Sequence, residues 1–286
     1  MLANSSLRGA LWMSGAVLSF CLMAISARQL LAHMGPFEVV LMRSIVMLLI
    51  VLALVPRTGV AALRTRRLGL HLLRNGVHFC GQYLWVFSIG ALPLATVFAI
   101  EFTMPVWTVL LAALFLHERI TYPRVVALGL GLAGVLVILR PGLGFAQPAA
   151  LAMLLGSLAY AASLILTKRL TTSDAPLAVL FWMSVIQLPM GLVASLPQWV
   201  TPVAADLPWI IAVGIGSYTA HYCLTRALKI ADASVVVGID FVRLPLIALL
   251  GALLYNEALD PMVFVGAAII FTGTYYSVSR ESRKGS

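Results

Sequence analysis

Two stretches of this chain decide its fold: residues 36–55 read PFEVVLMRSIVMLLIVLALV, and residues 176–196 read PLAVLFWMSVIQLPMGLVASL. Each can cross a membrane as a helix, because a span of about 30 Å of hydrocarbon needs about 20 mainly apolar residues. A shift of 140 residues lays the first stretch on the second and aligns Pro36 with Pro176. The sequence therefore predicts a membrane protein with an internal repeat.

Comparable apolar segments recur along the whole chain. The composition agrees, since 62% of the 286 residues are hydrophobic and 10% are charged, whereas a soluble domain is about 25% charged. We predict an all-α integral membrane protein of ten transmembrane helices. The spans are expected near residues 9–28, 36–55, 72–90, 94–115, 124–140, 149–168, 176–196, 207–226, 234–254 and 262–280.

The basic residues indicate the orientation of these spans. A net charge of +9 on a soluble protein would suggest a nucleic-acid partner, but here the basic side chains lie in short gaps between apolar segments. Of the 19 Lys and Arg residues, 15 fall on the side of the amino terminus, and only Arg28 and Arg140 fall on the other. The positive-inside rule then places both termini in the cytoplasm. We expect a multi-pass protein of a bacterial inner (plasma) membrane and no nucleic-acid partner.

The repeat continues through the rest of each half. Residues aligned by a shift of 140, or of 139 from the third span onward, are Ser44 with Ser184, Tyr83 with Tyr222, Glu101 with Asp240, Glu118 with Glu257, and Gly134 with Gly273. Five spans are an odd number, so the second repeat inserts upside down relative to the first. We therefore expect inverted halves, residues 1–145 and 146–286, around a pseudo-two-fold axis in the membrane plane.

A proline lies within the fourth and ninth spans, Pro105 and Pro245, and a glutamate follows each, Glu118 and Glu257. With the five-plus-five spans, the glycine-bearing fifth and tenth spans and Arg43 in the second, this pattern resembles the drug/metabolite transporter superfamily. Within it the chain is similar to EamA-type bacterial exporters of aromatic and other hydrophobic amino acids. The resemblance implies a central cavity between spans one to four and six to nine. Pro245 lies one residue late for the repeat, so the two bends need not superpose.

Ionisable side chains inside a span are costly in hydrocarbon and indicate function. Arg43, His78, Glu101, Asp240 and Arg243 lie inside spans. Because Arg43 and Glu101 both lie about 10 Å inside the outer membrane face, they are expected to pair across the bundle. Asp240 is expected to pair with Arg243 one helical turn away. These pairs either lock the bundle or leave Glu101 or Asp240 to exchange a proton or sense a substrate amino group.

Polar residues also form a stripe on the third span. His78, Gln82 and Trp85 follow the i, i+4, i+7 spacing of one helical face, and the eighth span carries polar residues at the repeat-related positions. We expect both stripes to line the cavity, together with aromatic and polar residues inside other spans. The predicted substrate-binding residues are His78, Gln82, Tyr83, Trp85, Glu101, Tyr160, Ser163, Trp182, Ser217, Tyr218, His221, Tyr222 and Asp240.

No motif for catalysis, a metal or a cofactor is found. Cys21, Cys80 and Cys223 match neither a metal motif nor a disulfide framework, and without a phosphate loop we expect no ATP-binding site in this chain. The preferred function is export of small amphiphilic metabolites, foremost aromatic or hydrophobic amino acids, by alternating access. The alternatives are an intramembrane hydrolase using Glu101 and Asp240, although a Gly-x-Ser-x-Gly nucleophile motif is absent, a channel, and an exporter of drugs or other metabolites.

Overall fold

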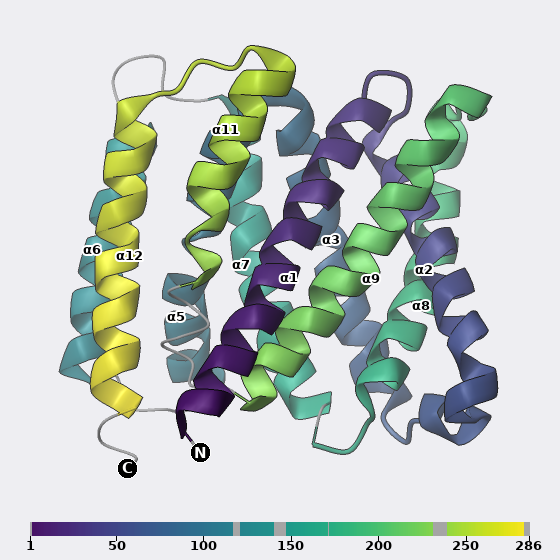
Figure 1. Cartoon of the computed structure of the whole chain (residues 1–286), viewed down its shortest axis with the longest axis horizontal. Helices are drawn as coiled ribbons and strands as arrows, with labels where there is room; N and C mark the ends of the chain where they lie inside the picture. The colour runs from purple at the N-terminus through teal and green to yellow at the C-terminus, as the bar shows by residue number, and fades with distance from the viewer. Residues whose placement is uncertain (1, 117–120, 140–146, 171, 231–238, 283–286) are drawn as a thin grey trace.

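The computed structural model describes residues 2–116, 121–139, 147–170, 172–230 and 239–282, and the regular elements of this part of the chain are all helices (Figure 1). The α-helices are α1 (Leu2–Leu30), α2 (Pro36–Thr58), α3 (Leu68–Ala91), α4 (Leu94–Glu101), α5 (Met104–Leu116), α6 (Tyr122–Leu139), α7 (Pro148–Leu170), α8 (Pro176–Ser195), α9 (Leu207–Ile230), α11 (Arg243–Tyr255) and α12 (Pro261–Ser282). Short 3₁₀ helices are η1 (Val60–Leu63), η2 (Leu196–Gln198) and η3 (Ala204–Asp206).

These helices confirm an all-α membrane protein. Six segments are long and apolar enough to cross a membrane, one of which runs from α4 into α5, and α6 and α11 contain shorter apolar helices. With α4 and α5 counted as one crossing, the described helices account for the ten predicted crossings. Polar residues on α3 and α9 lower their hydropathy, and these two helices carry much of the candidate site described below.

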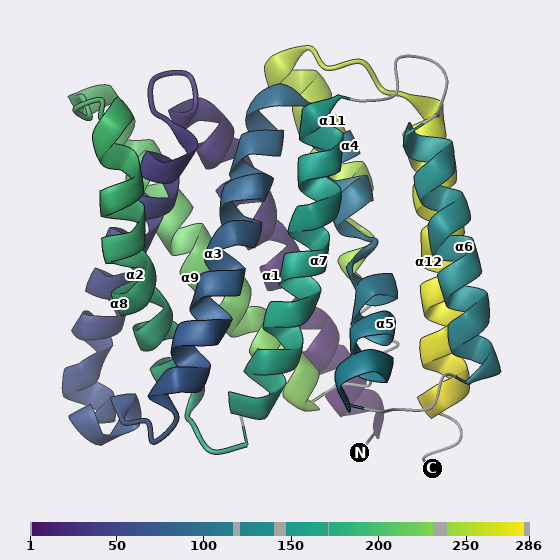
Figure 2. The same cartoon turned by 180° about the vertical axis from the view of Figure 1, so that it is seen from behind.

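The two halves run in opposite directions. α1 starts, and α12 ends, at the same end of the bundle, which we call the terminal end, and α7 descends towards it although its counterpart α1 rises from it (Figures 1 and 2). The loop between α2 and α3 also lies at the terminal end and carries Arg64, Arg66 and Arg67. The other end, which we call the far end, holds the α1–α2 and α8–α9 connections.

The halves are interleaved rather than separate. α1 packs against α9, α3 against α7, α2 against α8, α4 against α11, and α6 against α12, so each of these contacts joins one half to the other. Exchanging the halves turns the α1–α9 contact into the α7–α3 contact and leaves the α2–α8 and α6–α12 contacts unchanged, and the α4–α11 contact joins the fourth span to the ninth. A two-fold packing pattern of this kind is what inverted repeats produce.

The fourth and ninth spans are each broken, whereas the sequence predicted spans over 94–115 and 234–254 that are bent at proline. In the fourth span α4 ends at Glu101 and α5 begins at Met104. Proline explains the break, because Pro105 has no N–H to donate to the Glu101 carbonyl and its ring crowds that carbonyl. The Thr103 hydroxyl instead donates to the Ile100 carbonyl at 2.7 Å and closes a tight turn.

In the ninth span the chain turns at residues 241–242 before α11 begins at Arg243. Pro245 acts here as Pro105 does, on the carbonyl of Phe241. The turns at residues 102–103 and 241–242 are 139 residues apart, so the breaks follow the repeat although the prolines are offset by one residue. The remainder of this predicted span, residues 231–238, lies outside the described residues.

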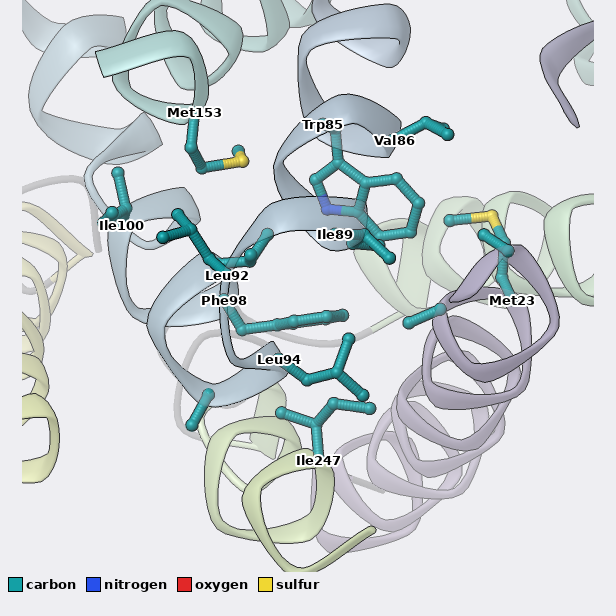
Figure 3. Close-up of a cluster of buried hydrophobic side chains, with 14 of the residues drawn as sticks. Met23, Trp85, Val86, Ile89, Leu92, Leu94, Phe98, Ile100, Met153 and Ile247 are labelled. Atoms are coloured by element: carbon teal, nitrogen blue, oxygen red, sulfur yellow. The ribbon is translucent and has the colours of Figure 1, made fainter. Parts of the chain in front are cut away.

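Apolar side chains from both halves fill the space around these breaks. Figure 3 shows Met23 of α1, Trp85 of α3, Phe98 of α4, Met153 of α7 and Ile247 of α11 around one centre, and all five are buried. Glycine residues allow α6 and α12 to pack closely against each other. A Cβ on Gly134 would collide with the Gly266 carbonyl, so the two helix backbones touch there.

Candidate functional site: two buried polar clusters

The first buried polar cluster is centred on Arg43 of α2, whose residue surface is 1% exposed. Its guanidinium donates to the Ser217 hydroxyl of α9 at 2.9 Å and to Gln187 Oε1 of α8 at 2.6 Å. Gln187 Nε2 lies 2.9 Å from His78 Nδ1 of α3. Hydrogen bonds thus connect four helices in the apolar interior, where each buried polar group needs a partner.

The same cluster continues towards the terminal end through Arg74, which is 4% exposed. Its guanidinium donates to Asn75 Oδ1 at 2.8 Å and to the Thr167 hydroxyl of α7 at 3.0 Å. We call Arg43, Arg74, Asn75, His78, Gln187 and Ser217 the Arg43 cluster. Among the described residues, no carboxylate forms an ion pair with either arginine.

The second buried cluster is centred on Arg243, which is 4% exposed. Its Nη1 lies 3.2 Å from Glu101 Oε1, and its Nε lies 3.2 Å from Asp240 Oδ1. The Trp85 indole donates to Glu101 Oε2 at 2.8 Å. We call Trp85, Glu101, Asp240 and Arg243 the Arg243 cluster. Because Glu101 ends α4 and Arg243 begins α11, this cluster connects the breaks of the fourth and ninth spans.

The predicted ion pair between Arg43 and Glu101 is wrong. Arg43 contacts the neutral side chains of α8 and α9, whereas Glu101 pairs with Arg243. The reason is packing, since α4 lies against α11 and α2 lies against α8 and α9. The predicted pair of Asp240 with Arg243 is confirmed.

Tyr160 of α7 lies between the two clusters. Its ring centroid is 5.5 Å from that of His78, and the residue is within electrostatic range of Arg43, Glu101 and Arg243. The His221 ring of α9 lies 6.1 Å from His78, and its Nδ1 lies 2.8 Å from the Ser217 carbonyl. Because a carbonyl only accepts, Nδ1 carries the proton, and Nε2 of neutral His221 is an acceptor.

Gln82 and Ser163 extend this group along the facing surfaces of α3 and α7, one helical turn from His78 and Tyr160. Each residue is 2% exposed. Among the described residues, neither side chain has a hydrogen-bond partner. A polar group without a protein partner can bind a ligand or water. The structure therefore brings His78, Tyr160, Ser217 and His221 together by contacts and hydrogen bonds, and places Gln82 and Ser163 one helical turn from His78 and Tyr160.

Other predicted residues lie apart from this group. Tyr83 stacks on Phe37 with 4.1 Å between ring centroids, and the Trp182 indole donates to a backbone carbonyl of η1 at 3.0 Å. Tyr218 stacks on Tyr222 at 6.0 Å. The contacts of Tyr83 and Trp182 connect neighbouring helices, whereas the stack of Tyr218 on Tyr222 lies within α9. All four side chains therefore have structural contacts. A substrate contact for them stays a prediction.

The sequence analysis missed Gln187 and Asn75, which hold the Arg43 cluster together. Gln187 is fully buried and bonds both Arg43 and His78. The signal was present, because Gln187 is an amide inside an apolar span and an amide in hydrocarbon must find a partner. The rule that we applied to ionisable residues therefore extends to Asn and Gln.

Glu257, one of the two motif glutamates, follows α11 and joins it to α1 and α4 at the far end. Its carboxylate pairs with Arg28 of α1 at 2.5 Å and accepts the Leu94 N–H at 2.7 Å. A carboxylate at the first N–H groups of a helix stabilises that helix. Glu257 thus connects the end of α1 with the beginning of α4. Its repeat partner Glu118 lies outside the described residues.

Two carboxylates pair with histidines at opposite ends of the bundle. At the far end, the Val203 backbone N–H and the His33 side chain lower the pKa of Asp206. At the terminal end, burial opposes ionisation of Asp174, but hydrogen bonds from Thr65, His71 and Ser173 outweigh it and lower the pKa of Asp174. These side chains therefore fix loops rather than the central site.

Comparison with known proteins identifies the family. The sequence model of the EamA-like transporter family matches residues 7–140 and again residues 147–279. This chain belongs to the EamA-like transporter family. The double match agrees with the inverted halves seen in the fold. A crystal structure that is 19% identical in sequence matches all of both chains with a TM-score of 0.69 and shares this fold.

Curated relatives of this EamA-like transporter span most of its length. The S-adenosylmethionine uptake transporter of Rickettsia prowazekii is 25% identical over 277 residues, which cover 97% of this chain and 94% of the relative. The riboflavin transporter of Rhizobium johnstonii is 33% identical over 232 residues (80% and 76%), and that of Vibrio cholerae is 28% identical over 284 residues (97% and 95%). These names do not support the expected likeness to amino-acid exporters.

Family membership makes the chain a transporter rather than an enzyme. The hydrolase alternative required Glu101 and Asp240 to work together as catalytic carboxylates. In the structure, Arg243 forms an ion pair with both, so both carboxylates are held by a structural ion pair. Neither the family nor the geometry favours hydrolysis.

Proposed function

We propose that this EamA-like transporter moves a small metabolite that joins an aromatic ring to a polar or charged group. The observation that carries this proposal is the pair of buried polar clusters near Tyr160. In one cluster the arginine pairs with carboxylates, whereas the two arginines of the Arg43 cluster have only neutral partners. A ligand beside Tyr160 and His78 would therefore meet aromatic rings together with the positive charge of the Arg43 cluster.

The depth of the site supports alternating access. His78 lies about 15 Å along α3 from the terminal end, and Ser217 lies about 15 Å along α9 from the far end, at 1.5 Å per residue. Both positions are near the middle of the bundle, where inverted-repeat transporters bind their substrates. We propose that residues 1–145 and 146–286 act as the two halves that rock around this site.

The substrate names of the relatives guide the choice of compounds. S-Adenosylmethionine and riboflavin, named for relatives of this chain, both join a flat heteroaromatic ring to a polar tail. Aromatic amino acids share that pattern in smaller form, and their export remains one hypothesis to test. The imidazoles of His78 and His221 and the phenol of Tyr160 supply flat rings against which such a ring can stack.

The energy source and orientation form part of the same proposal. The sequence carries no phosphate-binding loop, so we propose secondary transport driven by a substrate or proton gradient. We further propose placement in a bacterial inner membrane with both termini in the cytoplasm, as the basic loops indicate. A single cysteine at position 64 in a cysteine-free background tests this: an impermeant thiol reagent should label it in inverted vesicles and not in intact cells.

The direct test of function is flux into proteoliposomes. Labelled riboflavin, S-adenosylmethionine, Phe, Trp and Leu are offered with and without a pH gradient. We expect saturable uptake of at least one ring compound, with trans-stimulation by the unlabelled compound. Tyr160→Leu should reduce this flux about tenfold or more, whereas Tyr275→Leu, at a half-exposed tyrosine of α12, should preserve it. Single-channel conductance, or no flux of any ring compound, would refute the proposal.

A further inference from the structure

We propose that the Arg43 cluster binds an oxyanion, a carboxylate or a phosphate, on the transported metabolite. The proposal rests on the proposed function and adds the chemical class of the polar group. It starts from an imbalance of charge. Arg43 and Arg74 are 1% and 4% exposed, and a guanidinium does not lose its proton in a protein. Two permanent positive charges are therefore buried close together in this part of the bundle.

The groups around these arginines do not compensate the charge. α8 and α9 present Gln187 and Ser217 to Arg43, and α7 presents Thr167 to Arg74. α3 adds Asn75 and His78. Among the described residues, the other titratable groups facing the cluster are Tyr160 and His221. All are neutral or basic, and a buried charge without a counter-charge is unfavourable.

Among the described residues, the buried carboxylates have partners outside the Arg43 cluster. Glu101 and Asp240 both pair with Arg243, and Asp174 lies 2.8 Å from the His71 ring. Glu38 accepts the backbone N–H groups of Gly35 and Val200. The missing negative charge is therefore not supplied by these carboxylates. A substrate that carries an oxyanion supplies it each time the site is occupied, so charge compensation becomes part of the binding energy.

Unused donors make the site suitable for an oxyanion in particular. Arg43 Nε is buried with no hydrogen-bond acceptor among the described residues, and no hydrogen bond between described residues uses the Gln82 or Ser163 side chain. Carboxylate and phosphate oxygens accept several hydrogen bonds at once, and the guanidinium fork matches their spacing. A neutral carbonyl accepts a hydrogen bond but leaves the positive charge uncompensated.

Matched ligand pairs test the proposal on the purified full chain in detergent. Riboflavin 5′-phosphate is compared with riboflavin, tryptophan with tryptamine, and S-adenosylmethionine with its decarboxylated form. Sodium phosphate and sodium acetate are tested as free oxyanions against sodium chloride at equal ionic strength. The measurement is the dissociation constant from ligand-dependent thermal stabilisation. The phosphate and carboxylate arms show which oxyanion the site accepts.

We expect the anionic member of at least one pair to bind about tenfold or more tightly than its partner, which corresponds to about 1.4 kcal/mol. In Arg43→Gln and Arg74→Gln this preference should fall to about twofold or less. Arg43→Lys, which keeps the charge, should retain part of it. Arg57→Gln, at an exposed arginine near the end of α2, should keep the full preference. The wild-type pairs test the idea even where a variant fails to fold.

Two results would overturn the inference: equal binding of both members of every pair, or no stabilisation of the wild-type protein by any oxyanion. Either result is distinct from failure of the proposed function. Transport of only the neutral members would sink the oxyanion site and leave the transporter proposal standing. Binding of anionic members without flux of any ring compound would support the oxyanion site and refute the proposed transport function.

Discussion

The Arg43 and Arg243 clusters have the same central residue type but differ in the charge of its partners. Each is centred on a buried arginine that joins helices of both halves. Arg243 faces two carboxylates at 3.2 Å, and its guanidinium also lies 5.0 Å from the Phe98 ring centroid. Arg43 faces an amide and a hydroxyl. The same residue type is therefore compensated in one cluster and left in charge excess in the other.

This difference separates structural from functional burial of charge. A guanidinium with carboxylate partners closes a network, and removing one partner leaves an unpaired charge in a medium that solvates it poorly. A guanidinium with only neutral partners keeps an uncompensated positive charge, which can attract a negatively charged group of a ligand. The Arg243 cluster accordingly stabilises the junction of the two broken spans, and we propose the Arg43 cluster as the region where a charged ligand gains most binding energy.

The largest expected effect is on stability, at Arg243. Arg243→Met removes the cation between Glu101 and Asp240 and leaves both carboxylates buried and unpaired, so the free energy of unfolding should fall by about 3–5 kcal/mol. Thermal or denaturant unfolding in detergent measures this. The triple variant that adds Glu101→Gln and Asp240→Asn should recover most of the loss. An Arg243→Met protein as stable as wild type would contradict the compensated-cluster interpretation.

Arg43→Met should cost less stability than the matched change at Arg243. The variant loses charged hydrogen bonds to Gln187 and Ser217, worth about 1.5–3 kcal/mol each, but it also removes an uncompensated buried charge. We expect a net loss of about 1–2 kcal/mol in the same unfolding measurement. A loss as large as that of Arg243→Met would show that the clusters do not differ in the way described.

Glu257→Gln tests an ion pair that is neither central nor fully exposed. The side chains of Arg28 and Glu257 are 20% and 12% exposed, and Glu257 also accepts the Leu94 N–H at the start of α4. The amide keeps a hydrogen-bond acceptor but loses the charge, so the free energy of unfolding should fall by about 1 kcal/mol. Glu257→Ala should cost more, because it also removes the acceptor. Equal effects of the two substitutions would argue against the helix-capping role.

The smallest effect is expected at the far end, where His33 pairs with Asp206 at the surface. The pKa of Asp206 is lowered in the folded protein by the Val203 N–H and His33. A carboxyl with a lowered pKa contributes stability above its unfolded pKa, and that contribution is lost as the pH falls through the folded value. Asp206→Asn should therefore flatten the acid-side decline in melting temperature. If melting temperature falls with pH in the same way in Asp206→Asn and in the wild type, Asp206 does not contribute to the acid sensitivity of stability.

Hydropathy and periodicity were enough to predict most of the fold. The spans predicted at 36–55 and 176–196 correspond to α2 and α8, because the requirement for about 20 apolar residues acts on each segment by itself. The repeat also showed in local identities such as Glu101 with Asp240. The breaks at 102–103 and 241–242 were predicted only in part. Pro105 and Pro245 indicated bends in the sequence, but they did not show that the helices end there.

For the candidate site, the sequence identified the residue types and the structure assigned their partners. Arg43, Glu101, Asp240 and Arg243 stand out in the sequence because each is costly in hydrocarbon wherever it lies in a span. The i, i+3 pair of Asp240 with Arg243 follows from helix geometry within one turn. The expected pair of Arg43 with Glu101 does not form, because similar depth in the membrane does not make two helices neighbours.

The apolar segments and their repeat are enough to show that this chain is a helical membrane protein with two related halves, since burial of apolar segments in lipid is a local property. The tertiary structure decided which helices of the two halves meet, with α2 against α8 and α9, and α4 against α11. That packing gives Arg243 both carboxylates and leaves Arg43 with Gln187 and Ser217. These neighbours are distant in sequence but close in space. They decide whether a buried charge stabilises the bundle or stays available to a substrate, because electrostatic compensation depends on distance in space.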